Sequence, residues 1–230
     1  MSEENVIKEI NHPIYDLIVK DEVIKNYVTI QNEALQALGY TEHSFAHVGI
    51  VTQRVKYILD TLDYSDHEID LGMSAAYLHD IGNIVNRSSH SQSGGVMAFQ
   101  LLHDLKLDSQ DIAHIAMAIG NHDEGNGFPV NAMTAALIIA DKSDVRRSRV
   151  QEKEQGKFDI HDRVNYAVTE TLLKINQEKT GIKLKMTIDN RYCAVGEFFE
   201  IFMDRMLLCR RSATKLNLEF HLIINEQSLM

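Results

Sequence analysis

Histidine and aspartate side chains recur beside apolar stretches through most of the chain. The sequence contains eleven histidines and no tryptophan in 230 residues. The dipeptide His79–Asp80 ends the apolar, small-residue run 73–78, where two polar side chains are costly unless they have partners. A metal ion is such a partner, so this run predicts a buried metal site. Further candidate ligands on or beside apolar runs are His47, His90, His122 and Asp141.

Each of these residues also has a simpler interpretation when it is taken alone. His47 is then a core histidine with a satisfied hydrogen bond, His90 a loop residue, and His122 a residue at a helix C-terminus favoured by the helix dipole. Asp141 is harder to explain in this way, because a buried unpaired carboxylate is costly. Other histidines and His-Asp pairs are interpreted as surface residues, namely His43, His103–Asp104 and His161–Asp162.

The ordered set of these residues resembles the HD superfamily of metal-dependent phosphohydrolases, over roughly residues 45–147. The resemblance implies that His47, His79, Asp80 and Asp141 hold one divalent ion, and that Asp80 bridges to a second ion held by His90 and His122. Imidazole and carboxylate ligands together suit iron or manganese, with zinc as a further option. The implied reaction is attack of a metal-activated water on a phosphate ester or nucleotide, which makes Asp80 a catalytic residue as well as a ligand.

A local basic run follows Asp141 in this otherwise acidic chain. It contains Lys142, Arg146, Arg147 and Arg149. Cations beside a metal site neutralise the charge that develops on a phosphate, whereas cations at a solvated helix end need no such role. We expect Lys142 and Arg146 to contact phosphate and to act in catalysis.

Two branches of the HD superfamily are the most similar in their motifs. The cyclic-dinucleotide phosphodiesterases of the HD-GYP type carry a Gly-Tyr-Pro signature, which is echoed here by Gly127–Phe128–Pro129. The other branch comprises bacterial dinucleoside tetraphosphate hydrolases. Both commonly have a lysine three residues after the HD aspartate, where this chain has Asn83. The alternatives to a general phosphohydrolase are therefore a degenerate HD-GYP phosphodiesterase and a metal-holding regulatory or interaction module without turnover.

Helical periodicity accounts for the chain from Pro13 to about residue 165. Apolar residues recur at three- and four-residue spacings, which predicts amphipathic helices. The charged segment 151–157 is expected to be a solvated loop. The predicted helices cover residues 13–38, 45–62, 66–78, 94–105, 109–119 and 131–139.

The pattern changes near residue 158, where we place a domain boundary. Residues 172–175 and 182–188 flank a turn at 178–181, and the second run alternates apolar and polar residues, which predicts a β-hairpin. A helical period returns over 195–216, and alternation returns over 218–224. The predicted fold is mainly α: a helical HD-type domain over 1–158, then a β-β-α-β unit over 159–230 with an antiparallel sheet packed on its helix.

Composition limits the classes of partner. A net charge of −10 argues against nonspecific nucleic-acid binding, and two cysteines exclude a disulfide framework or a cysteine-based zinc module. The N-terminal residues lack the pattern of a secretory leader, and charges interrupt every long apolar run, so we expect a cytoplasmic protein without membrane association. The expected partner is a phosphorylated small molecule or nucleotide, and a homodimer is compatible with the sequence.

Overall fold

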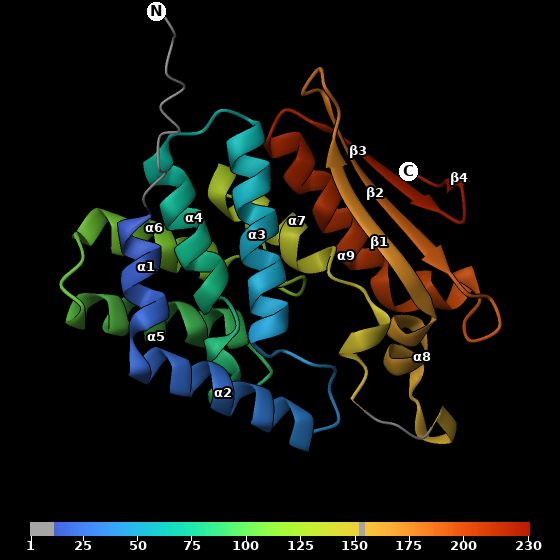
Figure 1. Cartoon of the computed structure of the whole chain (residues 1–230), viewed down its shortest axis with the longest axis horizontal. Coiled ribbons are helices and arrows are strands. Elements are labelled where there is room, and N and C mark those ends of the chain that lie inside the picture. Colours follow the sequence, from blue (N-terminus) through green and yellow to red (C-terminus); the bar gives the residue numbers. More distant parts are fainter. Residues whose placement is uncertain (1–11, 152–154) are drawn as a thin grey trace, which may run out of the picture.

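The structure is a computed structural model that describes residues 12–151 and 155–230. A bundle of helices occupies one side of the molecule, and a small sheet occupies the other (Figure 1). Helix α9 (Val195–Lys215) packs against helix α7 (Ala132–Lys142) of the bundle and against the sheet. The prediction of a mainly α fold with a small C-terminal sheet is confirmed.

The first predicted helix is two helices in the structure. Helix α1 covers Pro13–Lys20 and helix α2 covers Glu22–Ala37. Between them Asp21 has an extended backbone, with φ −71° and ψ 124°, and its side chain accepts a hydrogen bond from the backbone N–H of Ile24. Aspartate is a favoured N-cap because its carboxylate satisfies an otherwise unpaired N–H of the first turn. The single helix expected over 13–38 is therefore wrong at this position.

The remaining helices of the bundle lie close to their predicted positions. Helix α4 is buried along most of its length, and a capping box of Ser65 and Glu68 fixes its start. Helix α5 begins four residues before its predicted start, at His90, and α7 continues three residues beyond its predicted end. The bounds are α3 Phe45–Thr61, α4 Asp66–Leu78, α5 His90–Asp104 and α6 Ser109–Gly120.

A glycine allows the end of α4 to meet the start of α5. Gly82 lies in the short 3-10 helix η1 (Ile81–Ile84), which follows His79 and Asp80. A Cβ atom at Gly82 would lie 2.0 Å from the carbonyl oxygen of His90 and 2.5 Å from the backbone nitrogen of Gly94. Real Cβ atoms do not approach other atoms so closely, so only glycine permits this packing. The contact brings His90 beside the His79–Asp80 pair.

The C-terminal unit has the predicted β-β-α-β order, with a short helix before it. Helix α8 (Ile160–Ala167) leads into strand β1, and two-residue strand β4 ends the described sheet, whose strand order is β1-β2-β3-β4. The strands cover Val168–Ile175 (β1), Gly181–Ile188 (β2), Glu219–Ile224 (β3) and Gln227–Ser228 (β4).

The prediction of an antiparallel sheet is correct for two strand pairs and wrong for the third. Strands β1 and β2 are antiparallel, as are β3 and β4, but β2 and β3 are parallel. Helix α9 connects β2 to β3 and runs back along the sheet, so β3 starts at the same end as β2. A helical crossover of this kind produces a parallel pair.

One hydrophobic cluster spans both parts of the chain and includes Ile58 of α3 and Phe198 of α9. Cys193 and Cys209 are free and buried. The loop predicted over 151–157 lies partly outside the described residues, and its described end, Gln155–Lys157, forms a short 3-10 turn. The N-terminal segment 1–11 also lies outside them. Within the described ranges, no helix is long and apolar enough to cross a membrane.

Candidate metal centre

The structure brings all six predicted metal ligands to one place. His47 lies in the first turn of α3, and Asp141 lies at the end of α7. The other four lie at helix ends: His79 and Asp80 directly after α4, His90 at the start of α5, and His122 just after α6. All except Asp141 are almost fully buried, and the Asp141 side chain retains 11% of its exposure.

The first group of ligand atoms combines two imidazoles with two carboxylates. Nε2 of His47 lies 3.4 Å from Oδ1 of Asp141 and 3.8 Å from Oδ2 of Asp80. Nε2 of His79 lies 3.2 Å from the same Asp80 oxygen and 3.8 Å from the same Asp141 oxygen. The ligand atoms of His47, His79 and Asp141 all lie within 4.8 Å of one another, a spacing that fits a single ion.

The second group lies on the other side of Asp80. Oδ1 of Asp80 is 3.4 Å from Nε2 of His90, and that nitrogen is 3.2 Å from Nε2 of His122. The ligand atoms of His79, Asp80 and His122 again lie within 4.8 Å of one another. The two oxygens of Asp80 thus face different histidines, which is the arrangement of a carboxylate between two adjacent cation sites.

Hydrogen bonds fix which nitrogen of each imidazole faces the centre. The four histidines all use Nδ1 to bond an oxygen acceptor, so Nδ1 carries the proton and Nε2 keeps a lone pair directed inward. Among the described residues, the buried Nε2 atoms of His47 and His79 have no hydrogen-bond partner, and a metal ion would supply one. The Nδ1 contacts are His47 to Asp144 Oδ2 at 2.7 Å, His79 to Ala76 O at 2.8 Å, His90 to Arg87 O at 3.1 Å and His122 to Ile119 O at 2.7 Å.

The electrostatics of the centre suit a cation. Burial lowers the pKa of His122 well below its usual value and lowers that of His90, which favours the neutral form that binds metal. Burial acts in the same direction on His79, but the carboxylates of Asp80 and Asp141 outweigh it and raise the pKa of His79. Burial opposes ionisation of Asp80, yet the neighbouring histidines hold the pKa of Asp80 well below its usual range.

Sequence reasoning missed Asp144, which orients His47. Its side chain is 1% exposed, and it also accepts a hydrogen bond of 3.0 Å from Nε of Arg146. Burial alone would raise the pKa of Asp144, but the hydrogen bond from His47 and the nearby arginines hold it far below its usual range. One sequence signal could have identified Asp144. It follows Asp141 by three residues, a spacing that places both carboxylates on one side of the chain where α7 ends.

Arg146, which the sequence predicts to contact phosphate, lies behind Asp144 in the structure. Its guanidinium bonds Asp144 and, through a contact of 2.9 Å, Oε2 of Glu42. Its side chain lines a different surface pocket, beside α3 and β1. Arg146 therefore supports Asp144 through the carboxylate oxygen that His47 does not use, and its other two nitrogens bond Ser148 and Glu42.

Lys142 is buried at the metal centre and is occupied by carboxylates. Its Nζ atom lies 2.8 Å from Oδ2 of Asp141, 2.6 Å from Oε2 of Glu124 and 3.6 Å from Oδ1 of Asp123. Burial alone would lower the pKa of Lys142, but Asp141 and Glu124 raise it above its usual value. Glu124 in turn accepts a hydrogen bond of 2.7 Å from Nε of Arg205 on α9. These ion pairs connect the C-terminal unit to a predicted metal ligand.

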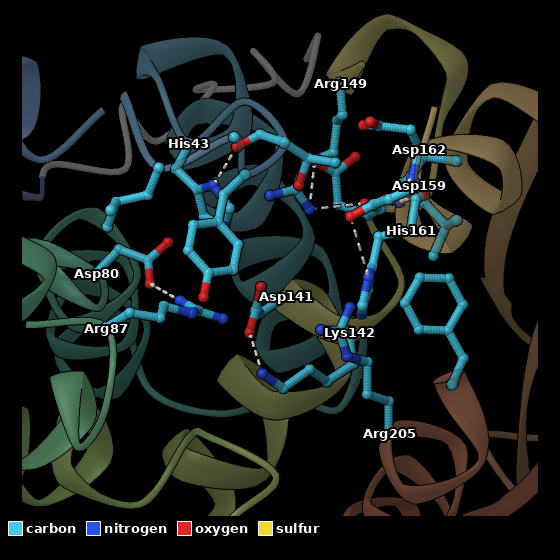
Figure 2. Close-up of a pocket in the computed structure, with 18 of the residues that line it drawn as sticks. His43, Asp80, Arg87, Asp141, Lys142, Arg149, Asp159, His161, Asp162 and Arg205 are labelled. Atoms are coloured by element: carbon cyan, nitrogen blue, oxygen red, sulfur yellow. Dashed lines mark hydrogen bonds and ion pairs between the residues drawn. The ribbon is translucent and has the colours of Figure 1, made fainter. Parts of the chain in front are cut away.

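A cavity of about 340 Å³ opens directly beside the ligands (Figure 2). Asp80, His90 and Asp141 contribute to its lining. His43 also lines it and is only 7% exposed, so its interpretation as a surface residue is wrong. Nδ1 of His43 lies 2.6 Å from the carbonyl oxygen of Thr41, and its ring contacts that of His47. His43 lies just before Ser44, the N-cap of α3, so the path of the chain into this helix places its ring beside that of His47.

Asn83 and Arg87 hold Asp80 from the opposite side. The Asn83 side-chain amide donates to the backbone oxygen of Asp80 at 2.8 Å and to its Oδ1 at 3.0 Å. NH1 of Arg87 donates to Oδ1 of Asn83 at 3.2 Å and lies 3.9 Å from Oδ1 of Asp80. An arginine linked to Asn83 thus brings positive charge to the side of Asp80 that faces His90.

The remaining His-Asp pairs differ in their environment. His103 and Asp104 are both exposed, as expected. His161 is also exposed at the start of α8, but Asp162 is buried, and both line the cavity beside the metal centre. In the fourth dipeptide, His122–Asp123, the aspartate side chain is 21% exposed. Only His79–Asp80 has both members buried among the other candidate ligands.

Comparison with known proteins gives one relative and no family assignment. No family model matches the chain. The chain is 24% identical over 212 residues to the archaeal protein named Uncharacterized protein MJ1020 from Methanocaldococcus jannaschii. That match covers 82% of this chain and 81% of the relative, so it extends beyond the helical part alone.

Proposed function

We propose that this protein is a metal-dependent phosphohydrolase with a two-metal site of the HD type. The observation that carries the proposal is the convergence of four histidines and two aspartates, three of which line an open cavity. The preferred ions are iron or manganese, because mixed imidazole and carboxylate ligands suit them. The substrate class is a phosphate ester or nucleotide. The order of the ligands along the chain, which resembles the HD superfamily, supports the same reading.

The residues around the centre have separable tasks under this proposal. When bound, the divalent ions supply Lewis-acid activation of water and neutralisation of phosphate charge. Asp80 offers one oxygen to each ligand group, and Asn83 fixes its orientation through the hydrogen bond to Oδ1. Lys142 balances the charge of Asp141. Arg87, close to Asp80 and lining the cavity, is the cation best placed to receive a phosphate oxygen.

The position of the cavity favours turnover over a metal-holding module. A purely structural metal site would be closed by packed side chains, whereas here Asp80, His90 and Asp141 border an open space. The segment that prompted the HD-GYP alternative does not support it. Gly127, Phe128 and Pro129 are absent from the described lining of this cavity, and Phe128 is 58% exposed.

The test combines metal analysis with a substrate panel. Protein purified without oxygen is analysed for bound metals, and is then assayed with p-nitrophenyl phosphate, bis-p-nitrophenyl phosphate, mononucleotides and a cyclic dinucleotide. The expected result is two ions per chain and metal-dependent release of phosphate or alcohol. Metal binding without hydrolysis of any of these esters would contradict the phosphohydrolase and favour the module.

A further inference from the structure

The cavity beside the metal centre has two walls that come from different parts of the chain. The bundle contributes the ligand side, with Asp80, Arg87 and Asp141. The C-terminal unit contributes the opposite side, through His161 on α8 and Phe202 and Arg205 on α9. A substrate in this cavity would therefore contact both units at once. The metal ligands alone do not explain why the second wall carries an arginine and a histidine.

Arg205 is held in place with donors to spare. Its Nε–H bonds Oε1 of Glu124 at 2.7 Å, and its guanidinium carbon lies 4.6 Å above the ring of Phe202, which is fully buried. A guanidinium has five N–H donors, and within the described part of the chain only Nε–H of Arg205 has a protein acceptor. The side chain is 25% exposed and lines the cavity. The ring of Phe202 and the carboxylate of Glu124 hold Arg205 in place, and its side chain borders the cavity.

His161 adds a second donor on the same wall. Figure 2 shows the His161 and Arg205 side chains directed toward one another, on the side of the cavity away from Arg87. The carboxylates of Asp159 and Asp162 also line this wall, and Asp162 is buried. One oxygen of Asp159 caps α8 through the backbone N–H of Asp162, and the other lies 3.7 Å from Nδ1 of His161. His161 and Arg205 thus place an imidazole and a guanidinium on one cavity wall, and both groups are common donors to oxyanions.

The opposite wall already provides for one oxyanion. Under the proposed function the scissile phosphate lies at the metal ligands beside Arg87, which is backed by Asn83 and lies 5.7 Å above the Tyr40 ring. Lys142 and its carboxylates separate Asp141 from Arg205, through successive contacts of 2.8, 2.6 and 2.7 Å. Arg205 and Asp141 are thus connected through Glu124 and Lys142, and both line the same cavity.

We propose that Arg205 and His161 form a second oxyanion subsite, so that the substrate carries another carboxylate or phosphate group beside its scissile phosphate. The inference rests on the proposed function only in placing the first oxyanion at the metal ligands. The cavity of about 340 Å³ lies at the small end of the range for small-molecule sites, roughly 300–1,000 Å³. It suits a compact compound with two oxyanion groups and not a dinucleotide. The C-terminal unit is then the part of the protein that selects the substrate.

Non-hydrolysable phosphonates test the subsite without relying on turnover. Propylphosphonate and 3-phosphonopropionate differ only in a terminal carboxylate, and ethane-1,2-bisphosphonate replaces that carboxylate with a second phosphonate. Their affinities for the manganese-loaded full chain are measured by titration calorimetry, with metal content checked after each titration. The wild-type protein is expected to bind one or both of the two-anion ligands about tenfold more tightly than propylphosphonate. Which of them is preferred identifies the second oxyanion as carboxylate or phosphate.

The variants separate binding from structural support. Arg205→Met is expected to abolish the preference while leaving metal content and propylphosphonate affinity unchanged, and Arg205→Lys is expected to keep part of it. His161→Gln, at an exposed position, is expected to reduce the preference about threefold. Arg211→Met, at an exposed position of the same helix, is the matched control and is expected to behave as wild type.

The outcomes distinguish this inference from the proposed function. Equal affinity of the wild type for all three phosphonates, binding of none of them, or a preference that survives in Arg205→Met, overturns the subsite. If esters are hydrolysed in that case, the phosphohydrolase stands without it. If the preference is present and depends on Arg205 but no ester is hydrolysed, the subsite stands and the phosphohydrolase fails.

Discussion

Nδ1 of His47 on α3 donates a hydrogen bond of 2.7 Å to Oδ2 of Asp144, which lies 97 residues further along the chain. This bond fixes the tautomer and the ring orientation of His47, so that Nε2 points toward Asp80 and Asp141. A carboxylate that holds a ligand histidine in this way strengthens metal binding without touching the metal.

Replacing Asp144 tests this support. Asp144→Asn keeps the size of the side chain but removes its charge, and we expect metal affinity to fall about 10- to 100-fold. Competition with a chromogenic chelator measures the change, and circular dichroism checks that the helices remain. Unchanged metal affinity in a folded variant would show that His47 needs no carboxylate partner.

Asp80 should be the least replaceable ligand, because its two oxygens face different histidines. Asp80→Asn removes the charge that holds divalent ions, and we expect loss of most bound metal and of activity with the helical fold retained. Asp104→Asn is the matched control, since Asp104 belongs to the exposed His103–Asp104 pair. Elemental analysis of both variants decides the matter: full metal occupancy in Asp80→Asn contradicts the assignment of Asp80.

His90 and His122 should contribute to the second ion and not to the first. Their Nε2 atoms lie 3.2 Å apart, next to Oδ1 of Asp80, whereas His47 lies beside Oδ2. We expect His90→Ala and His122→Ala each to reduce the metal content from two ions to one per chain. One ion per chain in the wild type, unchanged in both variants, would instead indicate a mononuclear site.

Gly82 should control the placement of His90, because a side chain there would collide with the backbone at the start of α5. We expect Gly82→Ala to destabilise the protein by about 1–3 kcal/mol and to weaken binding of the second ion. Gly49→Ala is the control, since a Cβ atom at Gly49 in α3 meets nothing within 4 Å and alanine favours a helix. Denaturant unfolding compares the two variants. Equal stability would mean that the start of α5 adjusts freely.

Lys142 should matter for stability as well as for any substrate, because it lies buried among carboxylates. Lys142→Met leaves Asp141 and Glu124 without their cation, and we expect a loss of about 3–5 kcal/mol in the free energy of unfolding. The measurement uses chelator-treated protein, so that metal loss does not contribute. A loss below about 1 kcal/mol would indicate that solvent already screens these carboxylates.

The same lysine predicts a pH dependence. Burial by itself raises the pKa of Glu124, but the charges of Lys142 and Arg205 have a larger and opposite effect. The pKa of Glu124 is therefore well below its ordinary value of 4.5. The unfolded chain then binds more protons than the native chain in mild acid, so stability rises with pH up to the unfolded pKa and is lost as pH falls below it. We expect the free energy of unfolding of Lys142→Met to fall less steeply with decreasing pH than that of the wild type. Denaturant unfolding between about pH 3 and pH 6 measures this dependence. Parallel curves for the two proteins would remove Lys142 as the cause.

The sequence located most of the helices and predicted which histidines and aspartates gather into the candidate metal site. Apolar periodicity located the helices because each must bury one face, and the failure at Asp21 arose because a single capping residue interrupts a pattern that otherwise continues. Asp80 and Asp141 were recognisable because burying a carboxylate at the end of an apolar run costs free energy unless a partner compensates for it. The β-β-α-β order was also readable, but the parallel pairing of β2 with β3 followed from the path of α9.

Tertiary structure decided which residues surround the candidate ligands. Local periodicity did not predict the burial of His43. It also did not predict the hydrogen bond between His47 and Asp144, or the contact of Arg205 with Glu124, because these residues are far apart in the sequence. Arg146 and Lys142 were equally basic in the sequence, yet one lies behind Asp144 and the other beside Asp141. Residue type limits what a side chain can do, whereas the packing of distant helices sets its distance to a partner, and ion pairs and ligand bonds depend on that distance.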